Sequence, residues 1–299
     1  MYTIDTKGKI NKDVTISMLS DFHFNENTKT RSIIKLLDKI EKEQPNYIFL
    51  LGDIINDGKN VNNIFRNVSF YLNLMGTIAP VYMVYGNHDL MIRDNNGWDE
   101  YINDDYVSML NSVENLKVLD NESVLLDENI GLVGIRLPFS YYQTYSEDSN
   151  KCLEIMNDKV NNHLLDGIDN ESYNIFLTHT PNNFFDKKIY LEILKMIREN
   201  IGKDINFDLL LAGHLHNGLI PVYLDKIIPG NRGLVGAIGR KYKLFINNCR
   251  GITKISDNTT GIILPAVNTL VQYPFLNNLY PASGKTLVLK SVDKFLKKN

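Results

Sequence analysis

The chain has 299 residues, of which 43% are hydrophobic, and its formal net charge at pH 7 is −3. That length and apolar content are enough for a full hydrophobic core, while the near-neutral charge gives no strong signal for nucleic-acid binding. The two cysteines, Cys152 and Cys249, form no CxxC pair, which argues against a disulfide framework and against a thiolate metal site.

The sequence shows no targeting or transmembrane segment. The first residues are polar and lack the apolar core of a signal peptide, and no stretch approaches the ~20 apolar residues of a spanning helix. We therefore expect a soluble, cytoplasmic protein. Apolar runs at residues 219–224 and 227–229 leave peripheral contact with a membrane open, and both runs could equally belong to the core.

Three strand-and-helix units are predicted in succession at the start of the chain. Residues 14–20, 47–51 and 81–85 are short apolar runs of the kind that forms buried strands. Residues 28–43 and 61–75 place apolar side chains at helical spacing, with polar side chains on the opposite face. Alternating strands and helices favour a parallel sheet, and binding sites of such sheets form at the carboxyl ends of the strands.

The alternation continues less regularly to residue 216 and gives way to a strand-rich, glycine-rich C-terminal part. Further elements are expected in this order: a helix over residues 98–110, short antiparallel strands within 116–136, an aromatic polar loop over 138–148, a helix over 151–165, a strand over 173–177, a helix over 191–199, and strands over 207–211, 244–247 and 285–290. No compositional break suggests a linker. We predict one α/β domain over residues 1–299, with a β-rich C-terminal portion over 217–299.

Polar side chains that can bind metal follow the predicted strands where each strand ends. They are Asp21, His23, Asp53, Asn87, His88, His179, His214 and His216, and Asp89 follows His88 directly. Of the 6 histidines in the chain, only His163 lies outside this set. Imidazole with carboxylate and amide oxygens is a ligand mix for divalent transition metals, and the lack of thiolates disfavours a structural zinc site. Without His88 the set still holds seven candidate ligands, which is too many for one tetrahedral ion but suits two ions that share a carboxylate.

These residues belong to five motifs: Asp21-x-His23, Gly52-Asp53, Gly86-Asn87-His88-Asp89, His179 and Gly213-His214-x-His216. In order and spacing, the motifs resemble the calcineurin-like metallophosphoesterase superfamily. The resemblance implies a four-layer sandwich in which helices flank two mixed β-sheets. The segment over residues 217–253 is similar to a narrower bacterial branch that includes UDP-diacylglucosamine pyrophosphohydrolases, and it identifies no substrate.

The resemblance also implies a role for each residue of the set. A first metal ion would be held by Asp21, His23, Asp53 and His216, and a second by Asp53, Asn87, His179 and His214, so that Asp53 bridges the two. Both would be divalent transition metal ions, with Mn, Fe or Zn expected, and a hydroxide shared by them would attack phosphorus. His88 would stabilise charge on the phosphate or protonate the leaving oxygen, and Asp89 would orient His88 or a metal ligand.

The activity that the resemblance implies is hydrolysis of a phosphomonoester or phosphodiester, pyrophosphate linkages included, in a small-molecule or lipid-linked substrate. Phosphoproteins are disfavoured, because Asp57 in the segment GDIINDG stands where the serine/threonine phosphatase branch has an arginine. Two other hypotheses stay open, a catalytically silent binding or scaffold protein on the same fold and a nuclease. The sequence predicts no particular oligomeric state.

Three tyrosines of the aromatic loop have two interpretations. Tyr141, Tyr142 and Tyr145 either line a substrate cleft or pack against one another in a surface loop.

Overall fold

The computed structural model describes residues 1–59, 63–93, 97–145, 147–224, 227–228, 230–238, 241–244, 247–268 and 283–291. Its first sheet has the order β1 (Tyr2–Asp5), β16 (Lys285–Lys290), β2 (Val14–Leu19), β3 (Tyr47–Leu51), β4 (Val81–Val84) and β7 (Leu116–Val118). Strands β2, β3, β4 and β7 run parallel, whereas β16 is antiparallel to β2 and parallel to β1. The parallel strands therefore end at one edge of the sheet.

The second sheet has the order β14 (Gly251–Lys254), β15 (Thr260–Ile263), β11 (Leu209–Ala212), β10 (Tyr173–Leu177), β9 (Ile130–Gly134) and β8 (Glu122–Leu126). Strands β9, β10, β11 and β15 run parallel, with β8 and β14 as antiparallel edges. The antiparallel strands expected within 116–136 are confirmed for β8 and β9. The expectation is wrong for β7, because a helical crossover brings that strand to the edge of β4 in the parallel direction.

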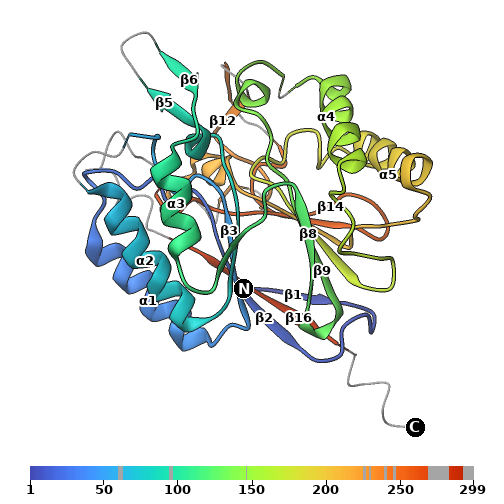
Figure 1. The fold of residues 1–299 in the computed structure, drawn as a ribbon, viewed down its shortest axis with the longest axis horizontal. Coiled ribbons are helices and arrows are strands. Elements are labelled where there is room, and N and C mark those ends of the chain that lie inside the picture. Colours follow the sequence, from blue (N-terminus) through green and yellow to red (C-terminus); the bar gives the residue numbers. More distant parts are fainter. Residues whose placement is uncertain are drawn as a thin grey trace.

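The α-helices of the described residues cover the outer faces of the two sheets. The first sheet is covered by α1 (Thr30–Glu43), α2 (Ile64–Ile78) and α3 (Asp104–Ser112), and the second by α4 (Ser149–Asn161) and α5 (Lys187–Ile201). Figure 1 shows the two groups of helices on opposite sides of the paired sheets. The expected α/β sandwich of two mixed sheets flanked by helices is therefore confirmed.

The large hydrophobic clusters correspond to the interfaces between these layers. In β3, Phe49 and Leu51 point into the cluster between the two sheets, while Ile48 and Leu50 point toward α1 and α2. The same alternation recurs in β10 and β11 of the second sheet. Because both faces of these strands are buried, their sequences are apolar, with Asn174 of β10 as a buried exception.

One predicted helix is wrong at its start. Within residues 98–110, β6 (Trp98–Glu100) forms a hairpin with β5 (Met91–Arg93), and α3 begins only at Asp104. The start of α3 is set by Asn103, whose side chain accepts hydrogen bonds from two backbone N–H groups of the first turn. The hairpin projects from the rim of the molecule in Figure 1.

The remaining elements are short. They are the 3-10 turns η1 (His88–Leu90), η2 (Asp127–Asn129), η4 (His216–Leu219) and η5 (Val222–Leu224), the π-helical turn η3 (Tyr141–Tyr145), and the hairpin of β12 (Val235–Ile238) and β13 (Lys241–Leu244). Parts of four predicted segments lie outside the described residues, namely 61–62, 146, 229 and 245–246. In the described part of the chain, no helix combines the length and apolar character needed to cross a membrane.

Candidate metal centre

Loops at the carboxyl ends of parallel strands carry the residues that the sequence predicts as metal ligands. In the first sheet, β2, β3 and β4 are followed by Asp21 and His23, by Asp53, and by Asn87 and His88. In the second sheet, β10 is followed by His179, and β11 by His214 and His216. Because the two sheets pack face to face, loops from both meet at a shared rim.

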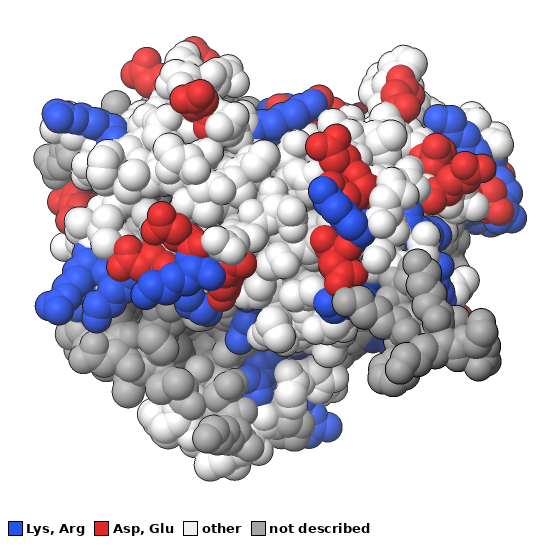
Figure 2. Space-filling view, turned by 90° about the horizontal axis from the view of Figure 1, so that it is seen from below, with Lys and Arg blue, Asp and Glu red and all other residues white. Residues whose placement is uncertain are grey.

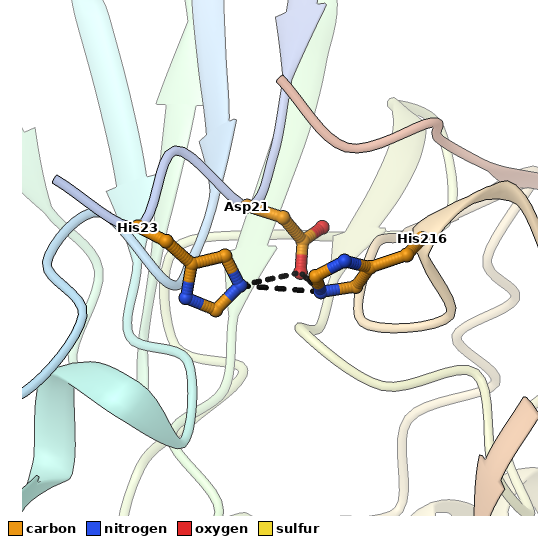
Figure 3. Close-up of side chains that lie close together, drawn as sticks. All are labelled: Asp21, His23 and His216. Atoms are coloured by element: carbon orange, nitrogen blue, oxygen red, sulfur yellow. Dashed lines mark hydrogen bonds and ion pairs between the residues drawn. The ribbon is translucent and has the colours of Figure 1, made fainter. Parts of the chain in front are cut away.

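The first group of ligand atoms comes from Asp21, His23 and His216. Asp21 Oδ1 lies 3.3 Å from His216 Nε2 and 3.9 Å from His23 Nε2, and the two Nε2 atoms are 3.2 Å apart. Figure 3 shows the Asp21 carboxylate between the two imidazole rings, with the three side chains pointing toward one another. Three such atoms within 4.8 Å of one another form an arrangement that one cation can bind.

The second group comes from Asp53, His179 and His214. Asp53 Oδ2 lies 3.1 Å from His179 Nε2, and His214 Nδ1 lies 3.2 Å from the same His179 nitrogen. Asp53 Oδ2 also lies 3.6 Å from His23 Nε2, which belongs to the first group. The Asp53 carboxylate therefore lies between the two groups, within reach of both.

Two buried oxygens at the cluster, Asp21 Oδ1 and Asn87 Oδ1, accept no hydrogen bond from the described residues. Asn87 precedes His88, whose backbone N–H donates to Asp53 Oδ1 over 2.7 Å, so this amide lies next to the central carboxylate. Leaving a buried acceptor without a donor costs about 1–3 kcal/mol, so such atoms indicate a partner of another kind. Oxygen and imidazole donors without thiolates are the ligands of divalent transition metals, and the cluster fits such ions.

In two of the histidines, a hydrogen bond from one ring nitrogen to a backbone carbonyl leaves the other ring nitrogen free to bind a cation or a substrate atom. His179 Nδ1 lies 2.6 Å from the Leu51 carbonyl oxygen, and His88 Nδ1 lies 2.6 Å from that of Asn56. A carbonyl oxygen only accepts, so Nδ1 carries a proton in both rings and donates it, which leaves Nε2 available. In His179 this free nitrogen is the atom that faces Asp53.

Five candidate ligands adopt the left-handed backbone conformation, which strains residues other than glycine. Their φ angles are 58° for Asp21, 45° for His23, 53° for Asp53, 67° for His214 and 46° for His216. Each such residue costs about 1 kcal/mol, and residues of this kind collect at functional sites. Since the strain falls on the ligands themselves, the loops are shaped to bring these side chains together.

Asp89 lies against the Asp53 loop and holds it by hydrogen bonds. The Asp89 carboxylate accepts the backbone N–H groups of residues 53–55 at 2.8–3.2 Å, that of Gly86 at 2.9 Å, and the Tyr106 hydroxyl at 3.0 Å. Burial and the charge of Asp53 raise the pKa of Asp89 to about 7. The hydrogen bonds that Asp89 accepts lower this pKa, but by less. The contacts of Asp89 therefore position the loop of a candidate metal ligand, Asp53.

Crowding of carboxylates and imidazoles shifts the pKa values of the cluster. Burial raises the pKa of Asp53, but the charges of His179 and His88 outweigh it and hold this pKa well below its ordinary value. Burial lowers the pKa of His214 to about 3. In His179 the Asp53 carboxylate overcomes burial and raises the pKa to about 9. Asp53 is therefore ionised at neutral pH, as a metal ligand must be.

Residues 14–218 match the family model described as calcineurin-like phosphoesterase. The chain belongs to this family. The match extends just past His216, so it includes every residue of the cluster. The family that the sequence motifs resemble is thereby confirmed.

Relatives of this calcineurin-like phosphoesterase are distant. It is 25% identical over 249 residues to an uncharacterized metallophosphoesterase of Campylobacter jejuni, a match covering 81% of this chain and 55% of that protein. It is 26% identical over 237 residues to an uncharacterized metallophosphoesterase of Bacillus subtilis, covering 75% and 71%. It is 27% identical over 199 residues to one subunit of the SbcCD nuclease of Staphylococcus epidermidis, covering 60% and 48%. The chain thus spans about half the length of the first and third of these proteins.

Among solved structures, a dimetal phosphatase from Danio rerio aligns with this calcineurin-like phosphoesterase at a TM-score of 0.40. The two sequences are 13% identical, and the alignment covers 85% of this chain and 87% of that one.

The structure also brings His88 of this phosphoesterase to the cluster. The His88 and His23 rings meet edge-on with centroids 4.4 Å apart, and His23, Asp53 and His88 form a third group of atoms that could hold a cation. His163, which the sequence left outside the set, lies exposed and pairs with Asp166 over 3.0 Å.

Two aromatic side chains border the candidate metal centre. Trp98 lies edge-on to His88, with ring centroids 5.8 Å apart. Tyr142 packs against His179 and His214, with centroids 5.9 and 5.4 Å apart. Burial, together with nearby carboxylates, holds the pKa of Tyr142 well above its ordinary value.

The sequence alone allows two interpretations of the tyrosine loop, a cleft lining and a self-packed surface loop. Its position after the parallel strand β9 is the signal that could have placed Tyr142 at this site. The side chain of Tyr145 lies outside the described part of the chain.

Proposed function

We propose that this protein hydrolyses phosphomonoesters or phosphodiesters with the aid of two divalent cations. The observation that carries the proposal is the position of Asp53 Oδ2, which lies 3.6 Å from His23 Nε2 in one group of ligand atoms and 3.1 Å from His179 Nε2 in the other. Membership of the calcineurin-like phosphoesterase family supports the same class of reaction.

Each cation would have its own set of ligands from this chain. One would be held by Asp21, His23 and His216, the other by Asn87, His179 and His214, with Asp53 shared by both. Mn, Fe or Zn suits this mixture of oxygen and imidazole donors. When bound, the cations would supply Lewis-acid activation of water and neutralise charge on the phosphoryl oxygens.

His88 is one side chain that would act on the substrate. Its Nδ1 is held by the Asn56 carbonyl oxygen at 2.6 Å, which leaves Nε2 to face a substrate oxygen. The half-buried ring lies between His23 of the cluster and Trp98 of the projecting hairpin. From this position, a protonated His88 would stabilise negative charge on the phosphoryl group or donate its proton to the leaving oxygen.

A nuclease is the second candidate, because one relative is named as a nuclease subunit. Binding of long DNA favours a continuous basic surface. On the face drawn in Figure 2, Lys and Arg are interspersed with Asp and Glu and form no continuous basic stripe among the residues described there. The net charge of −3 favours a small-molecule or lipid-linked phosphoester over nucleic acid.

Hydrolysis of chromogenic esters tests the proposal. The Mn²⁺-loaded protein is expected to hydrolyse p-nitrophenyl phosphate or bis-p-nitrophenyl phosphate, and Asp53→Ala and His88→Ala are expected to lose that activity. Full metal occupancy without hydrolysis of any ester in a broad panel would support a catalytically silent binding protein instead. Cleavage of DNA alone, falling steeply with salt, would support a nuclease.

The C-terminal portion supports the proposal of one domain over residues 1–299. Strand β16 lies inside the first sheet, and β14 and β15 extend the second. Location in the cytoplasm stays a prediction from the sequence.

A further inference from the structure

Tyr142 has a buried hydroxyl group with no hydrogen-bond partner. Its side chain is 4% exposed, and its hydroxyl oxygen makes no hydrogen bond in the described part of the chain. Buried polar groups in folded proteins are nearly always paired, so an unpaired hydroxyl requires an explanation. One explanation is a partner that is not part of this chain.

The position of Tyr142 indicates what kind of partner this is. Its ring packs on His179 and His214, with centroids 5.9 and 5.4 Å apart, and these are two of the ligands of one proposed cation. Tyr142 comes from the π-helical turn η3, a conformation that occurs frequently at functional sites. The missing partner therefore belongs beside the His179 and His214 side of the metal centre.

The neighbouring Tyr141 shows a tyrosine of the same turn in a purely structural role. Its hydroxyl donates to the Asn182 carbonyl oxygen at 3.2 Å and accepts from Asn183 Nδ2 at 2.8 Å. The rings of Tyr141 and Tyr142 contact each other edge-on, with centroids 5.9 Å apart, and both are buried. The two tyrosines thus share one packing environment and differ in whether the hydroxyl has a partner within the described chain.

We propose that Tyr142 donates a hydrogen bond from its hydroxyl to a phosphoryl oxygen of the bound substrate. A phosphoryl oxygen only accepts hydrogen bonds, and a tyrosine at neutral pH is a neutral donor, so the two groups are complementary. A donor that is already held in place before the substrate arrives stabilises charge on that oxygen without reorganisation. The inference rests on the proposed function and makes Tyr142 a further catalytic residue.

Binding of inorganic phosphate to the Mn²⁺-loaded protein tests this role, with Tyr141→Phe as the matched control. Tyr142→Phe is expected to weaken phosphate binding by about tenfold or more, because it removes a hydrogen bond to a charged acceptor. Its Mn²⁺ stoichiometry is expected to stay unchanged. Tyr141→Phe is expected to bind phosphate as the unaltered protein does. Titration calorimetry measures both affinities.

Urea unfolding of the metal-free protein gives a second readout that requires neither metal nor substrate. Tyr142→Phe removes a hydroxyl that has no partner, so its unfolding midpoint is expected to equal or exceed that of the unaltered protein. Tyr141→Phe removes a hydroxyl with two partners, so its midpoint is expected to fall. A stable variant with weakened phosphate binding is a result that a structural tyrosine would not give.

Two results would overturn this inference and leave the proposed function intact. One is equal phosphate affinity in Tyr142→Phe and in an unaltered protein that binds phosphate and hydrolyses esters. The other is a metal-free Tyr142→Phe that unfolds at a lower urea concentration than the unaltered protein. If the unaltered Mn²⁺-loaded protein neither binds phosphate nor hydrolyses any ester, the proposed function and this inference fail together.

Discussion

At the scale of single residues, Asp53 connects the two groups of candidate ligands. Asp53→Asn keeps the size of the side chain but removes the charge that would neutralise two cations. We expect its affinity for Mn²⁺ to fall by at least about tenfold, measured by titration calorimetry. Asp57→Asn in the same loop is the control, because the Asp57 carboxylate accepts the Lys59 N–H at 2.8 Å and lies outside the cluster. Equal Mn²⁺ affinity in both variants would contradict the bridging position.

Asp89 is predicted to matter for folding as well as for the site. The Asp89 carboxylate accepts hydrogen bonds from several backbone N–H groups. In Asp89→Asn, an amide NH₂ group would replace one carboxylate oxygen and would face these donors without being able to accept from them. We expect the free energy of unfolding to fall by about 2–3 kcal/mol, measured by urea denaturation. Tyr106→Phe removes only one of these bonds and is expected to cost about 1 kcal/mol. An Asp89→Asn protein as stable as the unaltered one would refute this role.

At the scale of elements, the loops after neighbouring strands touch backbone to backbone, and glycines make this contact possible. A Cβ atom at Gly86, after β4, would lie 2.2 Å from Asp53 Oδ1 and 2.4 Å from Asp53 N. Gly52, after β3, has a φ of 83° and would place its Cβ 2.5 Å from Gly86 N. The glycines of these motifs are therefore required by the close approach of two ligand loops.

Gly86→Ala is expected to displace the Asp53 loop and to lower both the unfolding midpoint in urea and the affinity for Mn²⁺. Gly230→Ala is the matched control, because a Cβ atom at Gly230 would meet no atom of the described residues within 4 Å. The account of these loops is wrong if the two alanine variants bind Mn²⁺ equally well.

The elements that the sequence predicts correctly are those buried on both faces. Strand β3 is a continuous apolar run, and β10 is apolar except for the buried Asn174. The bounds of both strands agree with the prediction, and the loops that follow them carry candidate ligands. The hairpin of β5 and β6 is not predicted from the sequence. Each of its strands has three residues, and all three residues of β6 are exposed, so no alternation of apolar and polar residues marks the hairpin. The contact of Tyr142 with His179 and His214 depends on the packing of two loops, which no local pattern encodes.

At the scale of the whole molecule, the first sheet contains a strand from the far end of the chain, which lies between the first two strands. Strand β16 pairs with β1 and β2, and Lys290 Nζ lies 2.7 Å from Asp13 Oδ2, 277 residues away in sequence. The motifs predict that candidate ligands follow the strand ends, but they do not assign each strand to a sheet and do not place β16. Both depend on contacts between residues distant in sequence.

The pair of Asp13 and Lys290 gives a pH dependence of stability. Hydrogen bonds from Lys290 and from the Ser291 N–H lower the pKa of Asp13 to about 2. A lowered folded-state pKa contributes stability above the ordinary pKa of an aspartate, and this stability is lost as the pH falls through 2. Asp13→Asn is therefore expected to be less stable than the unaltered protein at pH 7, by less than about 1 kcal/mol because the pair is exposed. The difference in free energy of unfolding should shrink as the pH falls from about 4 to 2; a difference that does not change with pH would contradict this origin.

The central claim is that loops from both sheets build one centre for two cations around Asp53. Anomalous diffraction from crystals grown with Mn²⁺ tests it most directly, because it locates the ions themselves. We expect two anomalous peaks, one beside Asp21, His23 and His216 and the other beside His179 and His214, with the Asp53 carboxylate between them. Fully occupied Mn²⁺ sites elsewhere on the protein, with no peak next to Asp53, would contradict the account.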